Sequence, residues 1–413
     1  MDRNPRNQTV KTEQEQLLTR RSFIHTGGVL TLAAATGCGS LDSPRRGPEG
    51  GPGSVTPPGR QDGPVPVSAD GPPGIAESAN ILDDTGAIIP GDAPASLLAD
   101  IVVPAGTYTQ QKSLQKDFGA LKDGQTIDCS KALFVQDSGG YRKYAHNFNP
   151  RIDGVNNVTI YRLRAMGSMK WTQDRTAAYR APHGNGTNLM LKNCKNLLVK
   201  EAFVGTDDQH CNWDHIKIGE GCANLTVEDS ALLYGFDDVS DNPRNIKVTY
   251  RNCWLLAMMG PAIENSAQNP QTVQDCTIEL HQVKNTNKAN GVPIRHGTFF
   301  KHQGSAPLIL HNVWLVSWGC SHRSWGSSMW KNLPVKWTGD CRILDLAHLA
   351  KHDGRAFDRE THGMPVFKGA QAVALYKQRK KLFLAQHAHM KKVWPDFDKI
   401  MEAATGGHVP IPL

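Results

Sequence analysis

The sequence predicts an all-β fold, a parallel β-helix whose short strands stack coil upon coil, followed by a helical C-terminal appendage. A strand phrase headed by Asn returns about every 20 to 40 residues, at residues 157–160, 196–199, 224–227 and 245–248, with looser copies at 277–280 and 308–311. Val, Ile, Leu and Thr dominate these phrases and favour strands. Gly and Asn punctuate the intervals, as tight corners require. Such short repeats stack because no single coil can bury its apolar face alone.

The N-terminal residues 1–38 are typical of an export signal. Arg20 and Arg21 begin a twin-arginine pattern, and the apolar run that follows, residues 27–36, is too short to span a bilayer. Small residues then precede Cys38, as in a bacterial lipoprotein box, in which the cysteine carries the lipid. We therefore expect export by the twin-arginine route to the periplasm or cell surface, and a membrane anchor through lipid on Cys38. Residues 39–75 are rich in Gly, Pro and Ser and predict a disordered tether.

The remaining chain is predicted as a β-helix domain over residues 76–340 and a helical appendage over residues 341–413. Strand-like residues 100–103 and 125–128 mark the entry to the solenoid, and the coils run from about residue 149 to about residue 318. Helical spacing follows over residues 369–386 and 387–404. Nine cysteines are present, and Cys194, Cys222, Cys253 and Cys276 come roughly one per coil. This spacing predicts one column of buried thiols. If Cys38 carries lipid, eight cysteines remain, and an even number in an exported protein also permits disulfides.

Composition limits the classes of partner. Of 413 residues, 39% are hydrophobic, and the formal net charge is +7. A modest positive excess is compatible with an anionic polymer, and also with an ordinary solvated surface. The sequence has neither a G-x-G-x-x-G motif nor a P-loop, so nothing indicates a nucleotide cofactor, and no motif indicates nucleic-acid binding.

Acidic side chains gather on two successive predicted coils. Asp214 lies on the first, and Asp237, Asp238 and Asp241 lie on the second. Equivalent positions of stacked parallel strands lie about 4.8 Å apart, so these carboxylates are expected to converge. Such a group repels itself unless a cation or protons intervene, and hard oxygen ligands suit Ca²⁺. The alternative is that these aspartates satisfy the backbone of corners.

Residues 203–218 and 224–233 resemble pectate lyases of the parallel β-helix type, polysaccharide lyase family 1. The family pattern runs through D-A-I-x-I to D-G-x-x-D, and the resemblance covers roughly residues 190–320. It implies a right-handed β-helix, Ca²⁺ on Asp214, Asp237 and Asp241 with Asp238 nearby, and calcium-assisted β-elimination on an acidic polysaccharide such as pectate. We expect a monomer.

The chain departs from the family at the catalytic arginine, which begins an R-x-P-R motif. Gly291 stands at that position here. Arg295, two residues beyond the proline, is the predicted base, with His296 and Lys301 as further catalytic candidates. A lyase needs a base near C5 of a uronate and positive charge to stabilise the enolate-like intermediate.

Two other functions stay open. A polygalacturonase-like glycoside hydrolase would use Asp214, Asp237 and Asp238, since N-x-D and G-x-D-D occur on successive coils. A non-catalytic glycan-binding β-helix would explain the missing arginine. Sugar rings could then stack on a set of tryptophans: Trp213, Trp254, Trp314, Trp318 and Trp325.

Overall fold

The chain divides into two units, Met1–Ile75 and Ala76–Leu413. The computed structural model describes part of the second unit, namely residues 99–136, 147–167, 169–170, 186–205, 210–242, 246–257, 262–265, 269–281, 299–302, 305–318, 332–349 and 360–403. The predicted signal, Cys38 and the tether all lie outside the described residues.

Most of the described unit is β-structure in parallel pairing. One sheet has nine strands, each hydrogen-bonded to the next: β1 (Ile101–Val102), β3 (Thr126–Asp128), β7 (Thr159–Tyr161), β11 (Lys195–Lys200), β14 (Ala223–Glu228), β16 (Val248–Arg251), β19 (Gln271–Gln274), β22 (Leu308–His311) and β24 (Val335–Thr338). We call this row ladder A.

The other sheet contains two rows that meet in one long strand, β15 (Ala231–Asn242). Ladder B comprises β2 (Gly106–Tyr108), β4 (Ala132–Gln136), β8 (Arg164–Gly167), β12 (Phe203–Val204), the first half of β15, β17 (Trp254–Ala257), β20 (Thr277–Leu280), β23 (Trp314–Ser317), β25 (Arg342–Asp345) and β26 (Val366–Lys368). Ladder C comprises β5 (Asn147–Phe148), β6 (Arg151–Asp153), β10 (Gly186–Lys192), β13 (His210–Ile218), the second half of β15, β18 (Ile263–Asn265) and β21 (Phe300–His302). The short β9 (Met169–Lys170) pairs antiparallel with β13.

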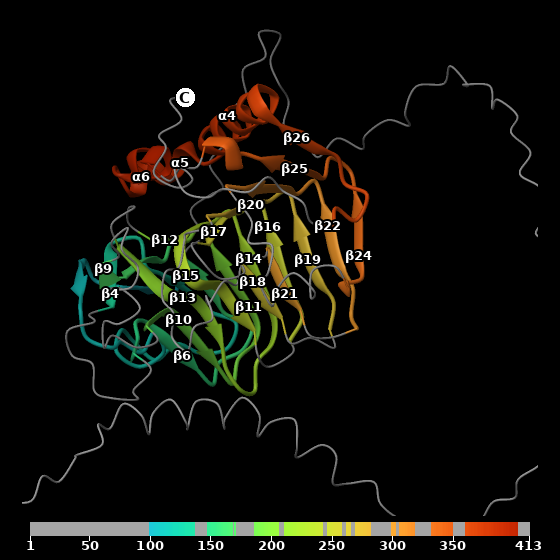
Figure 1. The fold of residues 1–413 in the computed structure, drawn as a ribbon. Helices are drawn as coiled ribbons and strands as arrows, with labels where there is room; N and C mark the ends of the chain where they lie inside the picture. The colour runs from blue at the N-terminus through green and yellow to red at the C-terminus, as the bar shows by residue number, and fades with distance from the viewer. Residues whose placement is uncertain are drawn as a thin grey trace, which may run out of the picture. The chain divides into compact units, whose positions relative to one another are not determined.

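The chain visits the ladders in a repeating order, A then B then C, from β7 to β21. Successive strands of one ladder are therefore separated in sequence by strands of the other two (Figure 1). This arrangement is an all-β, solenoid-like fold of parallel sheets, and it places equivalent positions of consecutive repeats side by side.

The asparagines that head three of the predicted phrases turn the chain into ladder A. The phrase predicted at residues 245–248 is displaced by two residues, since Val248 aligns with Leu225. Asn157, Asn196 and Asn224 have φ angles of 56°, 55° and 55°, a left-handed conformation that Asn tolerates better than most residues. Their side chains form a hydrogen-bonded row, in which the Nδ2 atom of Asn196 donates to the Oδ1 atom of Asn157 at 2.9 Å and Asn224 donates to Asn196 at 2.8 Å. The repeated asparagine is therefore a conformational requirement of the corner.

One looser copy of the phrase forms a strand but does not stack with the other copies. Residues 277–280 form β20 in ladder B, paired with β17 and β23. The strand that stacks on the true copies is β19, where Val273 aligns with Tyr250 and Leu310. Composition misleads here, because Thr277 and Ile278 are β-branched, as many ladder A residues are.

Replacing Asn196 by alanine is expected to destabilise the fold by about 1–2 kcal/mol, since alanine must adopt φ > 0 and cannot bridge its neighbours. Asn196→Gly should cost less, because glycine adopts this conformation freely. Urea unfolding of both variants measures the difference. Equal losses of unfolding free energy in both variants would mean that Asn196 does not stabilise the fold through its left-handed backbone conformation.

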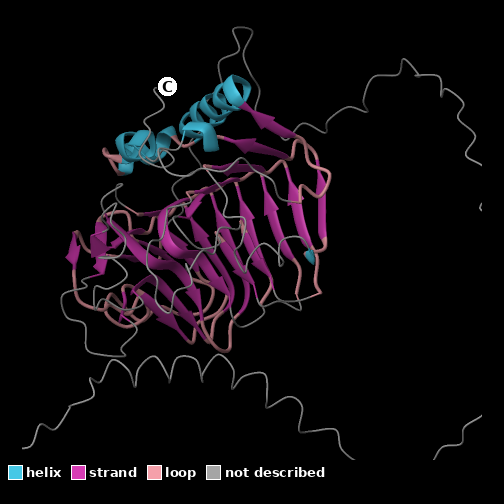
Figure 2. Cartoon of the chain, viewed as in Figure 1, coloured by secondary structure: helices cyan, strands magenta, loops and turns pink. Residues whose placement is uncertain are grey.

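Three helices cover the outer face of ladder B: α4 (Gly369–Gln386), α5 (Ala388–Val393) and α6 (Phe397–Ala403). The predicted segment 369–386 is α4, the predicted segment 387–404 is divided between α5 and α6, and a 3₁₀ turn (Ala347–Leu349) precedes the three helices. They gather on one side of the strands (Figure 2). A second hydrophobic cluster fills this interface, with Trp254, Trp314 and Trp318 from the strands and Tyr376 and Phe383 from α4 among its members.

Strand β17 of ladder B is thus apolar on both faces. In β17, Leu255 and Ala257 belong to the interior core, while Trp254 and Leu256 contact the helices' cluster. A strand buried on both faces is a continuous apolar run, not an alternating one. β25 and β26 continue the parallel pairing beyond residue 340, up to the start of α4.

The cysteines form pairs at two different corners instead of one column. Cys194 and Cys222 precede strands of ladder A, whereas Cys253 and Cys276 precede strands of ladder B. All four are free thiols, and all but Cys222 are buried. The predicted single column is therefore wrong, because a repeat of this fold has more than one corner at which a small apolar side chain fits.

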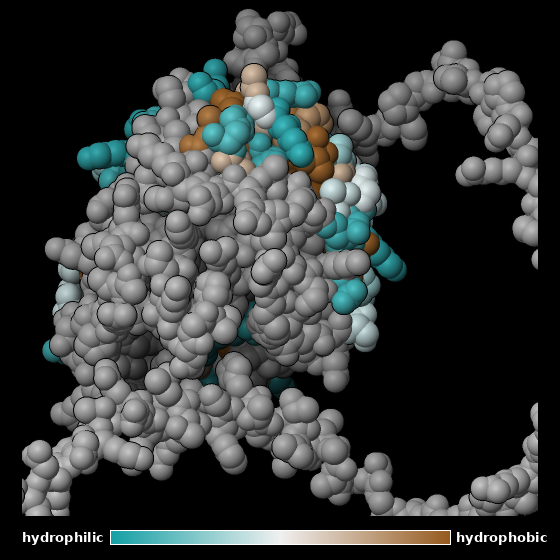
Figure 3. All heavy atoms as spheres, viewed as in Figure 1, coloured by the Kyte–Doolittle hydropathy of each residue, from teal (hydrophilic) through white to brown (hydrophobic). Residues whose placement is uncertain are grey.

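Exposed apolar side chains are scattered over the described surface. Val102, Ile309 and Leu382 are the large hydrophobic residues most exposed there, and they come from β1, β22 and α4. Hydrophilic residues lie among the hydrophobic ones on the coloured part of the face in Figure 3. Isolated residues of this kind do not mark an interface. Within the described residues, no helix combines the length and apolar character needed to cross a membrane.

Candidate metal centre

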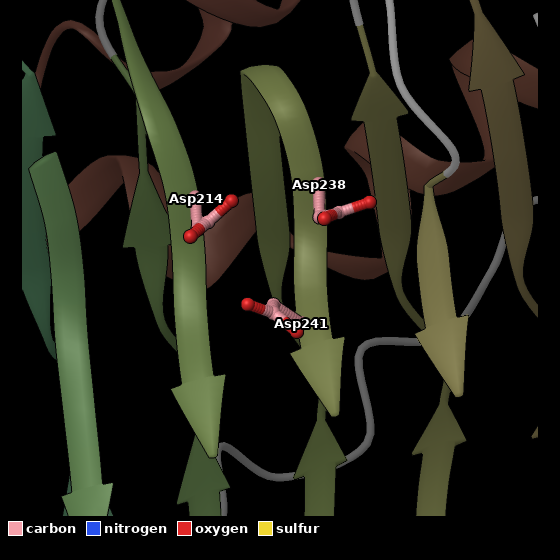
Figure 4. Close-up of side chains that lie close together, drawn as sticks. All are labelled: Asp214, Asp238 and Asp241. Carbon is pink, nitrogen blue, oxygen red and sulfur yellow. The ribbon is translucent and has the colours of Figure 1, made fainter. Parts of the chain in front are cut away.

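Three carboxylates converge where ladder C passes from β13 to β15. The register of these strands sets Asp214 opposite Asp238 and Lys217 opposite Asp241. One oxygen of each of Asp214, Asp238 and Asp241 lies within 4.8 Å of the others, and Figure 4 shows Asp214 on one strand and the other two on the next. All three residues are buried, with exposed fractions of 1%, 4% and 8%.

The strand path decides which aspartate faces Asp214. With an unbroken register, the pairing of Asn212 with Gly235 would set Asp214 opposite Asp237. Here the pairing register shifts between Asn212 and Asp214 on β13, and again between Leu232 and Gly235 on β15. The shift lies where β15 crosses from ladder B to ladder C, and irregularities of this kind re-aim side chains.

Lys217 supplies a positive charge within the group. Its Nζ atom lies 2.5 Å from Oδ2 of Asp241 and 3.5 Å from Oδ2 of Asp214. Burial opposes the charged form of Lys217, but the Asp214 and Asp241 carboxylates outweigh it and raise the pKa of Lys217 above its ordinary value. Lys217 therefore carries a positive charge at neutral pH. Sequence reasoning missed it, although it stands three residues after Asp214.

The row continues across two more strands. Asp241 aligns with Glu264 on β18, and Glu264 aligns with Lys301 on β21. The Nζ atom of Lys301 lies 2.6 Å from Oε1 of Glu264. Burial, reinforced by the charge of Asp241, raises the pKa of Glu264, although the Lys301 ammonium lowers it. Glu264 is a second member of the site that the sequence did not reveal.

The charges of this row do not balance. With every group ionised, four carboxylates face two ammoniums, which leaves an excess of two negative charges. The lysines are its more accessible members: the side chains of Lys217 and Lys301 are 21% and 17% exposed, against 2% for Asp214. An approaching anion would meet these ammonium groups before the carboxylates.

The donor set fits a hard divalent cation. Carboxylate oxygens are the ligands that Ca²⁺ prefers, and it takes six to eight oxygens in flexible geometry. Thr187 lies opposite Asp214 on β10, and its buried Oγ1 atom has no hydrogen-bond partner among the described residues. Three carboxylates and this hydroxyl could hold such an ion, provided that the Lys217 ammonium moves aside.

His215, between these groups in sequence, has a different role. Its Nδ1 atom lies 2.8 Å from the Asn188 amide and its Nε2 atom 2.6 Å from the Leu233 carbonyl oxygen. Burial lowers the pKa of His215 to about 4, although the Leu233 carbonyl raises it. A neutral, fully hydrogen-bonded imidazole belongs to the interior and takes no part in the site.

The predicted residues divide into three groups. Asp214, Asp238 and Asp241 come together, and Lys301 joins them through Glu264. Asp237 lies within β15, but its side chain is outside the described residues. Arg295 and His296 also lie outside them.

The tryptophans proposed to stack on sugars are in part excluded. Trp254 and Trp318 are 0% and 1% exposed, and Trp314 is 6% exposed, because the C-terminal helices cover them. The side chains of Trp213 and Trp325 are outside the described residues.

Replacing Lys217 by methionine is expected to tighten Ca²⁺ binding about tenfold or more, since a unit charge a few ångströms from the ion is removed. The same change should lower the thermal midpoint in chelator, because the carboxylates lose their counter-charge. Calorimetric Ca²⁺ titration and thermal unfolding measure the two effects. Lys200→Met, whose ammonium pairs with Glu228 and Asp229 on ladder A, is the matched control. Unchanged or weaker affinity for Lys217→Met would contradict a shared cation site.

A scan against protein-family models, a search of curated proteins and a search of solved structures found no match to this chain.

Proposed function

We propose that the chain is a right-handed parallel β-helix that cleaves an acidic, uronate-containing polysaccharide such as pectate by calcium-assisted β-elimination. The observation that carries the proposal is the convergence of the Asp214, Asp238 and Asp241 carboxylates within 4.8 Å, next to Lys217. The repeating order of ladders A, B and C supports the β-helix. Such a fold offers a long side face on which a polymer can lie.

The chemistry required is removal of the C5 proton of a uronate and departure of the C4 oxygen, which leaves a C4–C5 double bond. Ca²⁺, when bound, supplies positive charge for the uronate carboxylate. Lys217 and Lys301 offer further positive charge at the accessible side of the row and would stabilise the enolate-like intermediate. Because Lys217 has a raised pKa, it is a poor base, and we assign proton removal to Arg295, with His296 as second candidate.

Carboxylate spacing favours the lyase over the hydrolase. An inverting glycoside hydrolase usually keeps its two carboxyl groups about 6.5–9.5 Å apart to admit a water molecule. Asp214 and Asp238, two of the residues that a hydrolase would use, have carboxylate oxygens closer than that, and a divalent cation would resolve the repulsion of such a group directly. The raised pKa of Glu264 favours a hydrolase, since it would suit a general acid.

The N-terminal features support a proposed location. Arg20, Arg21 and Cys38 are consistent with twin-arginine export and a lipid anchor at the periplasm or cell surface, with the enzyme acting as a monomer.

The deciding experiment follows the ultraviolet absorbance of the unsaturated uronate product. Purified protein is mixed with a panel of polyuronates, first with Ca²⁺ and then with chelator. A calcium-dependent rise supports the lyase and identifies its polymer. New reducing ends without that absorbance would replace it by the hydrolase, and binding with neither would replace it by a glycan-binding protein.

A further inference from the structure

Two cysteines stack on one another at a corner of consecutive repeats. Lys195 aligns with Ala223 in the parallel pairing of β11 and β14, and the amide of Ala223 donates to the carbonyl oxygen of Cys194 at 2.9 Å. Cys194 therefore faces Cys222 across neighbouring strands. Parallel neighbours lie about 4.8 Å apart, which falls inside the range of about 4.4–6.8 Å between the Cα atoms of a disulfide.

The turns that lead to both cysteines have matching backbones. Asn193 and Gly221, which precede them, have φ angles of 51° and 74°. They are packed so closely that a Cβ atom on Gly221 would lie 2.3 Å from Oδ1 of Asn193. The corner therefore holds the two cysteines in register with little freedom to separate.

The pair is also reactive and accessible from one side. The interaction with Cys222 lowers the pKa of Cys194 to about 7, against burial, which raises it, and the same interaction together with burial raises the pKa of Cys222. One proton is thus readily lost from the pair, and a thiolate is the form that attacks disulfides. Cys194 is 1% exposed, but Cys222 is partly exposed, so a small reagent can reach the pair from Cys222.

We propose that Cys194 and Cys222 are an oxidation site that closes to a disulfide between successive repeats in the presence of a small-molecule disulfide. The Cys194 thiolate takes the proton of the Cys222 thiol, and the accessible Cys222 sulfur attacks the reagent and releases one of its halves, which leaves as a thiol. The Cys194 sulfur then attacks the mixed disulfide at Cys222 and releases the second half. Two protons and two electrons pass to the reagent, which becomes two thiols, while one S–S bond forms in the protein.

A second cysteine pair provides an internal control. Cys253 and Cys276 also face each other across neighbouring strands, since Trp254 aligns with Thr277, and the amide of Cys253 lies 3.3 Å from the Cys276 sulfur. Both are 0% exposed, and burial raises the pKa of Cys253 far above its usual value. With similar alignment but no access, this pair should stay reduced.

The test incubates the folded full-length chain with oxidised glutathione and blocks the remaining thiols with iodoacetamide after denaturation. Peptides are then mapped without reduction. A linked Cys194–Cys222 peptide is expected, with Cys253 and Cys276 alkylated. Cys222→Ser should abolish the linked peptide, and the matched Cys276→Ser variant should leave it unchanged.

Three results would overturn the proposal: alkylation of both Cys194 and Cys222, linkage of either to another cysteine, or formation of the link only when oxidant is added in denaturant. Because the readout is a peptide mass and not activity, its outcome is independent of the proposed lyase function.

Discussion

If the proposed function holds, Asp238→Asn is expected to abolish calcium-dependent cleavage, with at least about a hundredfold loss of rate, while Asp237→Asn should retain it. Asp238 is the residue that faces Asp214 across β13 and β15, and it is one of the three that converge. Two unit charges about 4 Å apart interact by about 4 kcal/mol near a protein surface. Loss of even part of one carboxylate's attraction for Ca²⁺ should therefore lower the Ca²⁺ affinity strongly. Asparagine keeps the size of the side chain and removes only its charge.

Initial rates of polyuronate cleavage and calorimetric Ca²⁺ titration check this result on both variants. Circular dichroism establishes that each variant is folded. The adjacent Asp237 is the sharpest control, because motif comparison alone chose it as the ligand. If Asp237→Asn loses Ca²⁺ binding and activity while Asp238→Asn keeps both, the ligand is Asp237, as the family motif implies. Asp238, which the strand register sets opposite Asp214, would then not be a ligand.

The second large effect concerns Glu279, a fully buried carboxylate that ties α4 to ladder B. It accepts hydrogen bonds from the indole nitrogens of Trp254 and Trp318 at 2.9 and 2.7 Å, and from the Tyr376 hydroxyl at 3.1 Å. The Nε2 atom of His281 lies 2.9 Å away. Glu279→Ala is expected to destabilise the protein by about 3–5 kcal/mol, because these buried donors lose their common acceptor.

Urea unfolding followed by tryptophan fluorescence measures this loss, since two of the tryptophans contact Glu279 directly. Glu228→Ala is the comparison. It removes a pair with Arg251, whose side chain is 48% exposed, and such surface pairs contribute about 0–1 kcal/mol. Similar losses in both variants would mean that the buried carboxylate does not hold the helices in place.

The corners and the helices could be predicted because the conformational preferences of residues close together in sequence determine them. Asparagine at 157, 196 and 224 marks left-handed corners whatever surrounds them. Residues 369–386 form the expected helix. The assignment of residues 277–280 failed because a short apolar strand carries no mark of the row that it joins.

The site was predictable only in part, because its members depend on register. The sequence indicated an acidic group but not that Asp238 faces Asp214, which follows from a local shift in pairing. Lys217, Glu264 and Lys301 come from three strands spread over 84 residues of sequence, and only the stacking of repeats makes them neighbours. The spacing of residues within a motif cannot reveal contacts between residues so far apart in sequence.

The interface around Glu279 has a consequence for the order of folding. Tyr376 reaches a carboxylate 97 residues earlier in the chain, and the same apolar cluster draws side chains from β12, β15, β17, β23 and β25. Contacts of such separation form slowly, after local ones. Docking of the helices therefore requires most of the repeats to be in place first. The C-terminal segment is the last piece to close, and a chain stopped before residue 369 would leave a row of tryptophans open to solvent and to self-association.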